Sequence, residues 1–343
     1  MIVQNRRGSE TGGGCAKITL RCADNSDAMT PSFDLSIIIV SWNTRELLHT
    51  CLRSVYAGMG SLRCEVLVVD NHSEDGSAEM VAKCFPQVRL IQNDTNRGFA
   101  AANNQALGIA RGRSLLLLNS DTEILGEVLP ASCHYLDEHE EIGVLGVRVL
   151  NPDRTLQPTC FRDPSLVNLL LYAFGVHRFS WPKWCGRERM IHWDRNDERV
   201  VDVVTGCFLL ARRDACVAVG LLDEQFFFYG EEADWCRRFR AEGWGVCFAP
   251  VGEIIHYGGA STKRISHRRL IMLAQAQVRY LGKYEGMISA VLGWLILGLA
   301  QGLRGRWGSL IHFARQSRPR SGHAIIPSLA NSEPSDERWN RAA

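Results

Sequence analysis

The sequence predicts an α/β fold in which a doubly wound, mostly parallel sheet is followed by C-terminal helices. Short runs of leucine, isoleucine and valine alternate with segments of helical periodicity, and only a few residues connect them. Two of the apolar runs stop abruptly at an aspartate, in Glu65-Val-Leu-Val-Val-Asp70 and in Leu115-Leu-Leu-Leu-Asn-Ser-Asp121. Because ligands of open parallel sheets bind at the carboxyl ends of the strands, we expect both carboxylates to face one crevice.

The composition is that of a globular protein with ample material for a core, since 46% of its 343 residues are hydrophobic. The 39 basic and 37 acidic residues leave a net charge of only +2, which excludes attraction of nucleic acid through overall charge. None of the 12 cysteines forms a Cys-x-x-Cys pair, and several lie in apolar runs. We therefore interpret them as reduced core residues of a cytosolic protein.

In the first 150 residues, the apolar runs predict strands and the segments between them predict helices. Asn43 and Glu46 resemble a capping box at the start of the first helix, and Asp75-Gly-Ser77 provides a turn and an N-cap before the second. Strands are expected at 35–40, 65–70, 88–91, 115–118 and 142–150, with helices after residues 43 and 77 and over 99–110 and 128–139.

The helix predicted over 99–110 is rich in alanine but also carries two amides, Asn103 and Asn104. Because asparagine costs helix propensity, we expect these side chains to face polar atoms of a ligand or a loop. Exposure to solvent is the alternative.

After residue 150 the regular pattern stops, and we expect 151–199 to form a loop-rich segment over the crevice. Strands are again predicted at 200–204, 208–211, 243–249 and 254–256, the last of which ends at His256. Between them, the aromatic run Phe226-Phe-Phe-Tyr229 leads into the acidic cluster Glu231-Glu-Ala-Asp234 at the start of a predicted helix.

Carboxylates at strand ends, beside Asn and Ser side chains, suit a nucleotide diphosphate that is held with a hard cation such as Mg²⁺ or Mn²⁺. We expect Asp70 to contact the nucleotide and Asp121 to contact the metal. The alternative for each is that it only caps the helix that follows.

The acidic cluster supplies candidates for a general base, because the aromatic run before it would desolvate a carboxylate and raise its pKa. The alternative is structural: acids in the first helical turn are favoured by the helix dipole, and Asp234 is spaced to pair with an arginine one turn on. His256 suits a metal ligand, a phosphate contact or a structural histidine.

The nearly uncharged segment 287–303 is flanked by Lys283, Arg304 and Arg306. It is shorter than the roughly 20 apolar residues of a spanning helix. We favour an interfacial helix with basic flanks over a helix packed on the domain or a true span. Residues 1–33 lack the apolar block of a signal peptide and are interpreted as a disordered leader or a misassigned start. The polar residues 315–343 are interpreted as a disordered tail.

An ordered set of motifs covers residues 35–262. The segments are Ser36-Ile-Ile-Ile-Val-Ser-Trp-Asn43, Val69-Asp-Asn-His-Ser73, Asp75-Gly-Ser77, Asn93-x-x-Asn96-x-Gly98-Phe99, Asn103-Asn104, Leu118-Asn-Ser-Asp121, Thr205-Gly206, Phe227-Phe-Tyr-Gly-Glu-Glu-Ala-Asp234 and His256. Together they resemble the family-2 glycosyltransferases, which have the Rossmann-like GT-A fold. The likeness is strongest to the rhamnosyltransferase-type branch that builds bacterial cell-surface polysaccharides.

This resemblance implies an inverting, metal-assisted transfer of a sugar, with rhamnose as one candidate, from a nucleotide-diphosphate donor to a hydroxyl of a glycan or lipid-linked acceptor. It implies Glu232 as the base, with Glu231 and Asp234 as further catalytic candidates. Mg²⁺ or Mn²⁺ would be held by Asp121 and His256. The implied donor-binding residues are Ser41, Asn43, Asp70, Asn71, Ser73, Asn96, Gly98, Asn103, Asn119, Ser120 and Asp121, and the implied sugar pocket is Thr205, Gly206 and Tyr229.

By the same resemblance, residues 34–265 form the GT-A domain, with a nucleotide-sugar-binding half at 34–150 and an acceptor half at 151–265. Residues 266–314 form C-terminal helices that dock on a membrane surface. The protein is then expected on the cytoplasmic face of the inner membrane, with no nucleic acid among its partners.

Two motifs depart from the family pattern. The usual Asp-x-Asp appears as Asn119-Ser-Asp121, which leaves one carboxylate for the metal, and the usual Glu-Asp pair appears as Glu231-Glu232. Glu232 stands in the place of the aspartate and is therefore favoured as base. The Gln-x-x-Arg-Trp motif of processive synthases is only approximated at 275–280, so one sugar per encounter is expected. The alternatives are a nucleotidyltransferase-like enzyme and a non-catalytic nucleotide- or carbohydrate-binding relative.

Overall fold

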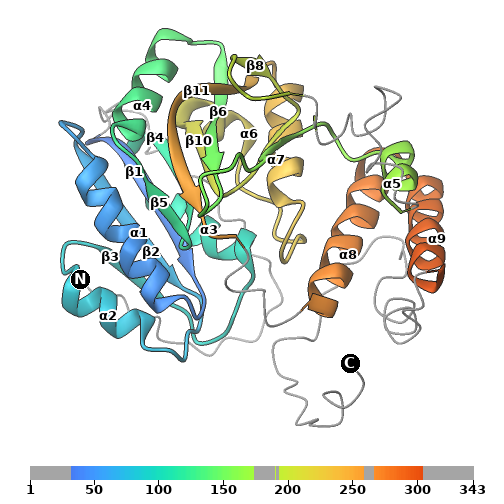
Figure 1. The fold of residues 1–343 in the computed structure, drawn as a ribbon, viewed down its shortest axis with the longest axis horizontal. Coiled ribbons are helices and arrows are strands. Elements are labelled where there is room, and N and C mark those ends of the chain that lie inside the picture. The colour runs from blue at the N-terminus through green and yellow to red at the C-terminus, as the bar shows by residue number, and fades with distance from the viewer. Residues whose placement is uncertain (1–31, 174–189, 191–192, 259–265, 304–343) are drawn as a thin grey trace, which may run out of the picture.

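The computed structural model describes residues 32–173, 190, 193–258 and 266–303. Most of the predicted leader and all of the predicted tail lie outside these ranges, as do Arg304 and Arg306. The described part is built around one large sheet with helices on both faces, and a helical group lies beside it (Figure 1). This arrangement confirms the predicted fold class.

The central sheet has the strand order β3-β2-β1-β4-β10-β6-β11-β5, and β8 pairs with β11. Strands β3, β2, β1 and β4 run parallel, as do β6 and β11, whereas β10 is antiparallel to both of its neighbours. The bounds are β1 Phe33–Ser41, β2 Cys64–Asp70, β3 Arg89–Gln92, β4 Gly112–Asn119, β5 Thr122–Ile124, β6 Ile142–Leu150, β8 Arg199–Val200, β10 Phe208–Arg212 and β11 Gly245–His256. A separate two-stranded sheet pairs β7 Cys160–Phe161 with β9 Val203–Val204.

Alternating residues of the strands face two apolar layers. Ile37 and Ile39 of β1 pack in the cluster that contains the buried sides of α1, α2 and α4, whereas Ile38 packs in the cluster of α3, α6 and α7. Both faces of the sheet are therefore covered, which explains why its strands read as continuous apolar runs. The helices are α1 Arg45–Gly58, α2 Ser77–Cys84, α3 Phe99–Leu107, α4 Val128–Glu138, α6 Arg213–Val219 and α7 Glu231–Ala241.

Two local predictions are wrong. Asn43 is not part of a capping box: it has a φ of 54°, Thr44 precedes the helix, and the Asn43 Oδ1 atom accepts a hydrogen bond from the Glu74 N–H at 2.8 Å. The strand predicted at 200–204 is split between β8 and β9, which pair with different strands. In both cases long-range contacts override the local pattern, because each segment gains partners that are distant in sequence.

The described cysteines are all free thiols, and most of them are buried. The prediction that they are reduced core residues is confirmed for this part of the chain.

The helical group consists of α5 Leu166–Ala173, α8 Ser266–Tyr284 and α9 Met287–Leu303. Its core is formed by Leu169 of α5 with residues of the two long helices, and Ala290 and Leu297 of α9 belong to it. None of the described helices has the length and apolar character that crossing a bilayer demands. The opposite side of α9 nevertheless exposes large apolar residues, among them Ile288 at 78% and Leu299 at 57%.

Candidate functional site

The carboxyl ends of β1, β2 and β4 meet at one edge of the sheet. Ser41 is in register with Asp70, and the preceding residue of β1 is in register with Asn119. A chain of buried hydroxyls ties these ends together: Ser41 and Thr44 lie 3.1 Å apart, and Thr44 donates to Ser120 at 2.9 Å. Asp70, the last residue of β2, and Asp121, two residues after β4, therefore lie at the same end of the sheet.

Asp70 presents an unused acceptor at this end of the sheet. Its residue is only 4% exposed, and its Oδ2 atom accepts the Ser73 N–H at 2.9 Å. Its Oδ1 atom is buried and has no hydrogen-bond partner among the described residues. Burial raises the pKa of Asp70 above the ordinary aspartate range. A buried acceptor without a donor is costly, so a ligand N–H or hydroxyl would be bound strongly here.

The loop after β3 is organised by Asn71. The Asn71 amide donates to Asn96 Oδ1 and to the Gly98 carbonyl oxygen, and its Oδ1 accepts from Asn93 and from the Arg97 N–H. Gly98 has a φ of 83°, and a Cβ atom there would lie 2.5 Å from the Phe227 carbonyl oxygen. The donor-side loop is therefore in backbone contact with the aromatic run that leads to the acidic cluster.

Asn103 and Asn104 are both buried, so the solvent-exposed alternative is wrong. The Asn104 amide donates to the Leu222 carbonyl oxygen and to Glu224, and its Oδ1 accepts the Leu222 N–H at 3.0 Å. Asn103 donates to the Phe99 carbonyl oxygen within its own helix. Asn104 thus fixes α3 to the loop before α7, whereas the donor contact expected of Asn103 stays a prediction.

Asp121 and His256 lie next to each other, because His256 of β11 is in register with Thr122 of β5 and Asp121 directly precedes that strand. The Asp121 Oδ1 and His256 Nε2 atoms lie 3.2 Å apart, and the Asn119 amide lies 3.2 Å from the same nitrogen. On the other side of the ring, Nδ1 lies 2.6 Å from Gln157 Oε1. The Gln157 amide nitrogen already donates to Asn151 and to the His256 carbonyl, so its oxygen must accept the Nδ1–H.

With Nδ1 as the donor, Nε2 can accept the Asn119 N–H, and it lies 3.2 Å from Asp121 Oδ1. A ring oriented through Nδ1 in this way can also ligate a metal through Nε2. One carboxylate and one imidazole suit Mn²⁺ or Mg²⁺ only if the substrate completes the coordination. The described residues contain no group of three or more His, Cys, Asp or Glu side chains arranged to hold an ion. The donor set fits a metal that arrives with a diphosphate.

Glu231 and Glu232 open α7 as a coupled pair. Burial raises the pKa of both, and the charge of Glu232 raises the pKa of Glu231 further. A hydrogen bond joins their side chains, while the backbone N–H groups of Gly206, Gly230 and residue 232 itself favour the ionised form of Glu232. Both members of this buried acid pair therefore ionise less readily than an ordinary glutamate.

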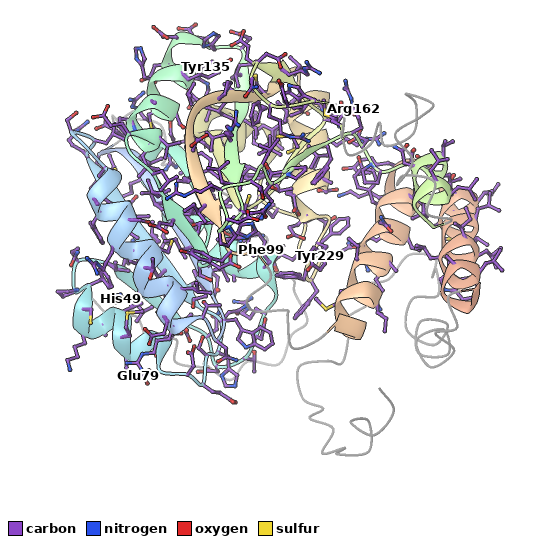
Figure 2. All side chains as sticks on the ribbon, in the orientation of Figure 1. His49, Glu79, Phe99, Tyr135, Arg162 and Tyr229 are labelled. Carbon is purple, nitrogen blue, oxygen red and sulfur yellow. The ribbon has the colours of Figure 1, made fainter. Side chains whose placement is uncertain are left out.

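The segment Thr205–Cys207 lies between the two acidic motifs. Burial raises the pKa of the Cys207 thiol to about 12, and the charges of both Asp121 and Glu232 add to this increase. The Asn119 N–H donates to the Cys207 carbonyl oxygen at 3.3 Å, and a Cβ atom on Gly206 would touch the Phe99 ring. Figure 2 shows Phe99 and Tyr229 at the same end of the sheet, facing α8. The Thr205–Cys207 segment is therefore close to both predicted motifs.

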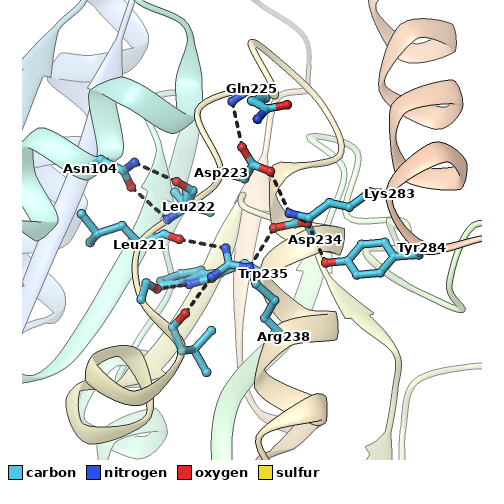
Figure 3. Close-up of polar contacts among 12 residues, drawn as sticks. Asn104, Leu221, Leu222, Asp223, Gln225, Asp234, Trp235, Arg238, Lys283 and Tyr284 are labelled. Atoms are coloured by element: carbon cyan, nitrogen blue, oxygen red, sulfur yellow. Dashed lines mark hydrogen bonds and ion pairs between the residues drawn. The ribbon is translucent and has the colours of Figure 1, made fainter. Parts of the chain in front are cut away.

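Asp234 has a different environment from that of its neighbours. It is 0% exposed, and its carboxylate pairs with Arg238 at 2.9 Å and Lys283 at 2.5 Å and accepts the Tyr284 hydroxyl at 2.7 Å (Figure 3). Lys283 also pairs with Asp223 at 2.7 Å. These bonds connect α7 to the end of α8 and to the preceding loop. They give Asp234 an anchoring role and occupy the oxygen atoms that proton transfer would need.

We expect Asp234→Asn to lower the free energy of unfolding by about 3 kcal/mol, at the lower end of the range for a broken buried ion pair because Arg238 and Lys283 keep some contact with water. Urea unfolding measures this loss. The matched control is Asp137→Asn, which breaks the exposed pair with Arg113 and should cost less than about 1 kcal/mol. Equal losses in the two variants would contradict the anchoring role.

Three residues of the site were not predicted from the sequence. Thr44 bridges the ends of β1 and β4, Asn93 shares its amide between Asn71 and Gln105, and Gln157 sets the tautomer of His256. Asn93 lies inside one of the motifs noted above, and Thr44 directly follows another. Gln157 lies in the irregular segment after residue 150, where no pattern marks it.

Comparison with known proteins places this geometry in a family. Residues 36–216 match the sequence profile of glycosyl transferase family 2. Over 247 residues, covering 68% of this chain and 80% of the relative, the chain is 28% identical to N-acetylglucosaminyl-diphospho-decaprenol L-rhamnosyltransferase of Mycobacterium tuberculosis. It is 26% identical over 228 residues to low-salt glycan biosynthesis hexosyltransferase Agl10 of Haloferax volcanii, covering 65% of this chain and 67% of that protein.

Among solved structures, the mannosyltransferase PcManGT from Pyrobaculum calidifontis, in complex with GDP-Man and Mn²⁺, superposes with a TM-score of 0.51 at 17% identity. The match covers 84% of this chain and 76% of that one. At this level of identity the likeness concerns the fold alone. The profile match extends over more than half of the chain, and it agrees with the motifs and the sheet described above. The chain therefore belongs to glycosyl transferase family 2 and has the GT-A fold.

Proposed function

We propose that this glycosyltransferase moves a sugar, with inversion, from a nucleotide-diphosphate donor to a hydroxyl of a lipid-linked acceptor in cell-surface glycan synthesis. The observation that carries the proposal is the pair Glu231–Glu232, which lies across the Thr205–Cys207 segment from Asp121 and His256. Asp121 and His256 then suit a diphosphate, and the glutamate pair supplies a general base for the acceptor hydroxyl.

On the donor side, Asp70 binds the base or ribose through its unused Oδ1 atom. Ser73, whose N–H holds the other oxygen of Asp70, also accepts the Asn43 N–H at 3.0 Å, so the two strand-end loops move as one unit. Asp121 and His256 would hold a divalent cation that accompanies the diphosphate. Such a cation, when bound, neutralises the charge that grows on the departing diphosphate.

On the acceptor side, Glu232 removes the proton of the acceptor hydroxyl. The hydroxyl oxygen forms a bond to the anomeric carbon from the face opposite the diphosphate, and the bond between that carbon and the diphosphate oxygen breaks. The electron pair leaves with the nucleoside diphosphate, and the configuration is inverted. In this proposal Glu231 carries the proton of the pair and donates a hydrogen bond to Glu232, whose charged form is also favoured by the Gly206 N–H.

The products test this function against the nucleotidyltransferase alternative. Sugar transfer releases a nucleoside diphosphate, whereas nucleotidyl transfer releases pyrophosphate. We expect nucleoside diphosphate from a panel of nucleotide sugars that includes a rhamnose donor. The true donor should also raise the thermal midpoint of the protein by mass action, and more so with Mn²⁺. Release of pyrophosphate would contradict the proposal, and binding without turnover would favour a non-catalytic relative.

A lipid-linked acceptor is supported by the apolar surface beside the site and by the printed name of the Mycobacterium tuberculosis relative. The exposed side of α9 is continued by Val167 and Leu170 of α5, which are 65% and 43% exposed. Apolar side chains on one side of a helix favour insertion into the interface of a membrane. We propose that α5 and α9 rest on the cytoplasmic leaflet, where such acceptors are concentrated.

We expect the triple change of Ile288, Leu295 and Leu299 to serine to reduce binding to anionic lipid vesicles by about tenfold or more, because each apolar side chain contributes on the order of 1 kcal/mol on insertion. Co-sedimentation with vesicles measures the effect. Val217→Ser is the matched control, since Val217 is also exposed but lies on α6. Undiminished binding by the triple variant would contradict docking through α9.

A further inference from the structure

A groove lies between the aromatic run and α8, immediately before the acidic pair. It is lined by residues 225–229 on one side and by Met272, Gln275, Ala276 and Arg279 of α8 on the other, and it is shallow and open to solvent. Its floor is fixed, because Phe226, Ala276 and Tyr280 pack in one apolar cluster. The groove therefore belongs to the rigid part of the described structure.

The lining ends at a strained turn that leads directly to the base. Tyr229 has a φ of 71°, a left-handed conformation that is costly for a residue with a side chain, and Gly230 follows with a φ of 88°. Glu231 and Glu232 come next. A molecule lying along the aromatic rings of Phe228 and Tyr229, which contact each other at 4.5 Å, is thus delivered to Glu232.

Arg279 gives this groove a positive charge whose hydrogen-bond partner is the neutral Gln225. The charge of Asp223 also acts on Arg279, although from beyond ion-pair distance. The Arg279 guanidinium donates to Gln225 Oε1 at 2.5 Å and lies 5.9 Å from the Phe226 ring centroid. No carboxylate of the described residues lies within ion-pair distance of it, whereas Lys283, one turn further along α8, pairs with two. Burial lowers the pKa of Arg279, which reflects the cost of holding this cation away from water.

We propose that the groove binds the phosphate-bearing part of the acceptor and that Arg279 is the residue that recognises it; this inference rests on the proposed function. A guanidinium donates two parallel hydrogen bonds to phosphate oxygens, and such charge-assisted bonds exceed the bond to an amide. Gln225 is exposed and releases Arg279 by a change of its side-chain rotamer. The bound phosphate offsets the desolvation cost that Arg279 already bears.

The order of groups along the chain matches the order of groups in such an acceptor. The terminal sugar lies over the aromatic rings with its hydroxyl at Glu232, and the phosphates lie at Arg279. The lipid then continues toward the end of α8 and the exposed apolar side of α9, which begins three residues after Tyr284. The three parts of one molecule therefore meet three consecutive surfaces of matching chemistry.

Three synthetic acceptors with one sugar and one short alkyl chain, joined through a diphosphate, a monophosphate or directly as a glycoside, test the proposal. The wild-type protein should show the lowest KM for the diphosphate compound. Arg279→Gln should raise that KM by roughly 10- to 100-fold, the scale of a lost charge-assisted bond. The KM for the donor and for the alkyl glycoside should not change, and Arg279→Lys should recover part of the loss. Arg53→Gln, an exposed residue of α1, is the matched control.

Calorimetry without donor provides a second measurement that does not depend on turnover. The diphosphate compound should bind the wild-type protein and lose affinity in Arg279→Gln. If the variant binds and uses all three acceptors as the wild-type protein does, or if only its donor KM rises, the assignment of Arg279 is overturned. If the wild-type protein binds the diphosphate compound through Arg279 but transfers no sugar to any acceptor, the groove stands and the proposed function fails.

Discussion

Glu232→Gln is expected to bind the sugar donor with nearly unchanged affinity while turnover falls by about 10²- to 10⁴-fold. The amide keeps the shape of the carboxylate but cannot accept a proton, and losses of this size are usual for a general base. In the proposed mechanism the donor is bound at Asp70 and Asp121 and not at Glu232, so its affinity should survive. Calorimetry of donor binding and initial rates of transfer measure the two effects separately.

Glu231→Gln is the control for this experiment. Its amide can still donate to Glu232, so most of the turnover should remain. The pKa of Glu231 is higher in the folded protein than in the unfolded chain, so the folded state favours the protonated form. The free energy of unfolding is therefore larger at low pH, and it decreases as the pH rises through the raised pKa. The glutamine variant lacks this loss and should exceed the wild-type thermal midpoint at alkaline pH. Full activity of Glu232→Gln would move the base to Glu231.

The pH profile of the wild-type enzyme carries the same information. Since burial raises the pKa of Glu232, the acid limb of kcat/KM should lie above the pH at which an ordinary glutamate ionises, and activity should rise as the pH passes through that raised value.

Asp121→Ala is expected to lower the rate of transfer by about 10²- to 10³-fold. Asp121 is the carboxylate after β4 that would hold a cation, and without that cation the negative charge on the leaving diphosphate is not neutralised. The additional stabilisation that Mn²⁺ gives to the donor complex should vanish as well. Thermal unfolding with nucleotide sugar, with and without Mn²⁺, measures this independently of turnover. His256→Ala should resemble it, because the two side chains face each other at 3.2 Å.

Asp137→Ala, which removes an exposed acid of α4, is the control for these two variants and should behave like the wild-type protein. A full Mn²⁺ response in Asp121→Ala would show that the metal, if used, is held elsewhere, and would contradict the assignment of Asp121 and His256.

The donor half of the fold could be predicted from the sequence because its signals are local. A strand such as Leu115–Leu118 is buried on both faces and shows as a continuous apolar run, and its end is marked by Asp121. Strand β10 shows the limit. Its apolar run was recognised, but nothing within residues 208–212 indicates that it inserts antiparallel between β4 and β6.

The residues of the candidate site likewise fall into those that a local sequence pattern marks and those that depend on distant partners. Asp70, Asp121 and Glu232 were found because acids interrupt apolar or aromatic runs. Gln157 and the anchoring contacts of Asp234 depend on partners 99 and 50 residues away in the sequence, and such pairings leave no periodic signal. Arg279 lies in the incomplete motif at 275–280, and its role in the groove depends on Gln225, which is 54 residues away in the sequence.

The insertion of β10 also affects how the chain folds during its synthesis. While the ribosome is still synthesising residue 200, β4 and β6 are both complete but lack the strand that joins them. The nascent chain then exposes two long apolar edges, which favour aggregation until residues 208–212 emerge. Residues Thr205–Cys207 directly precede β10, and Glu231 and Glu232 of α7 follow it. The proposed site can therefore form only after β10 has paired with β4 and β6.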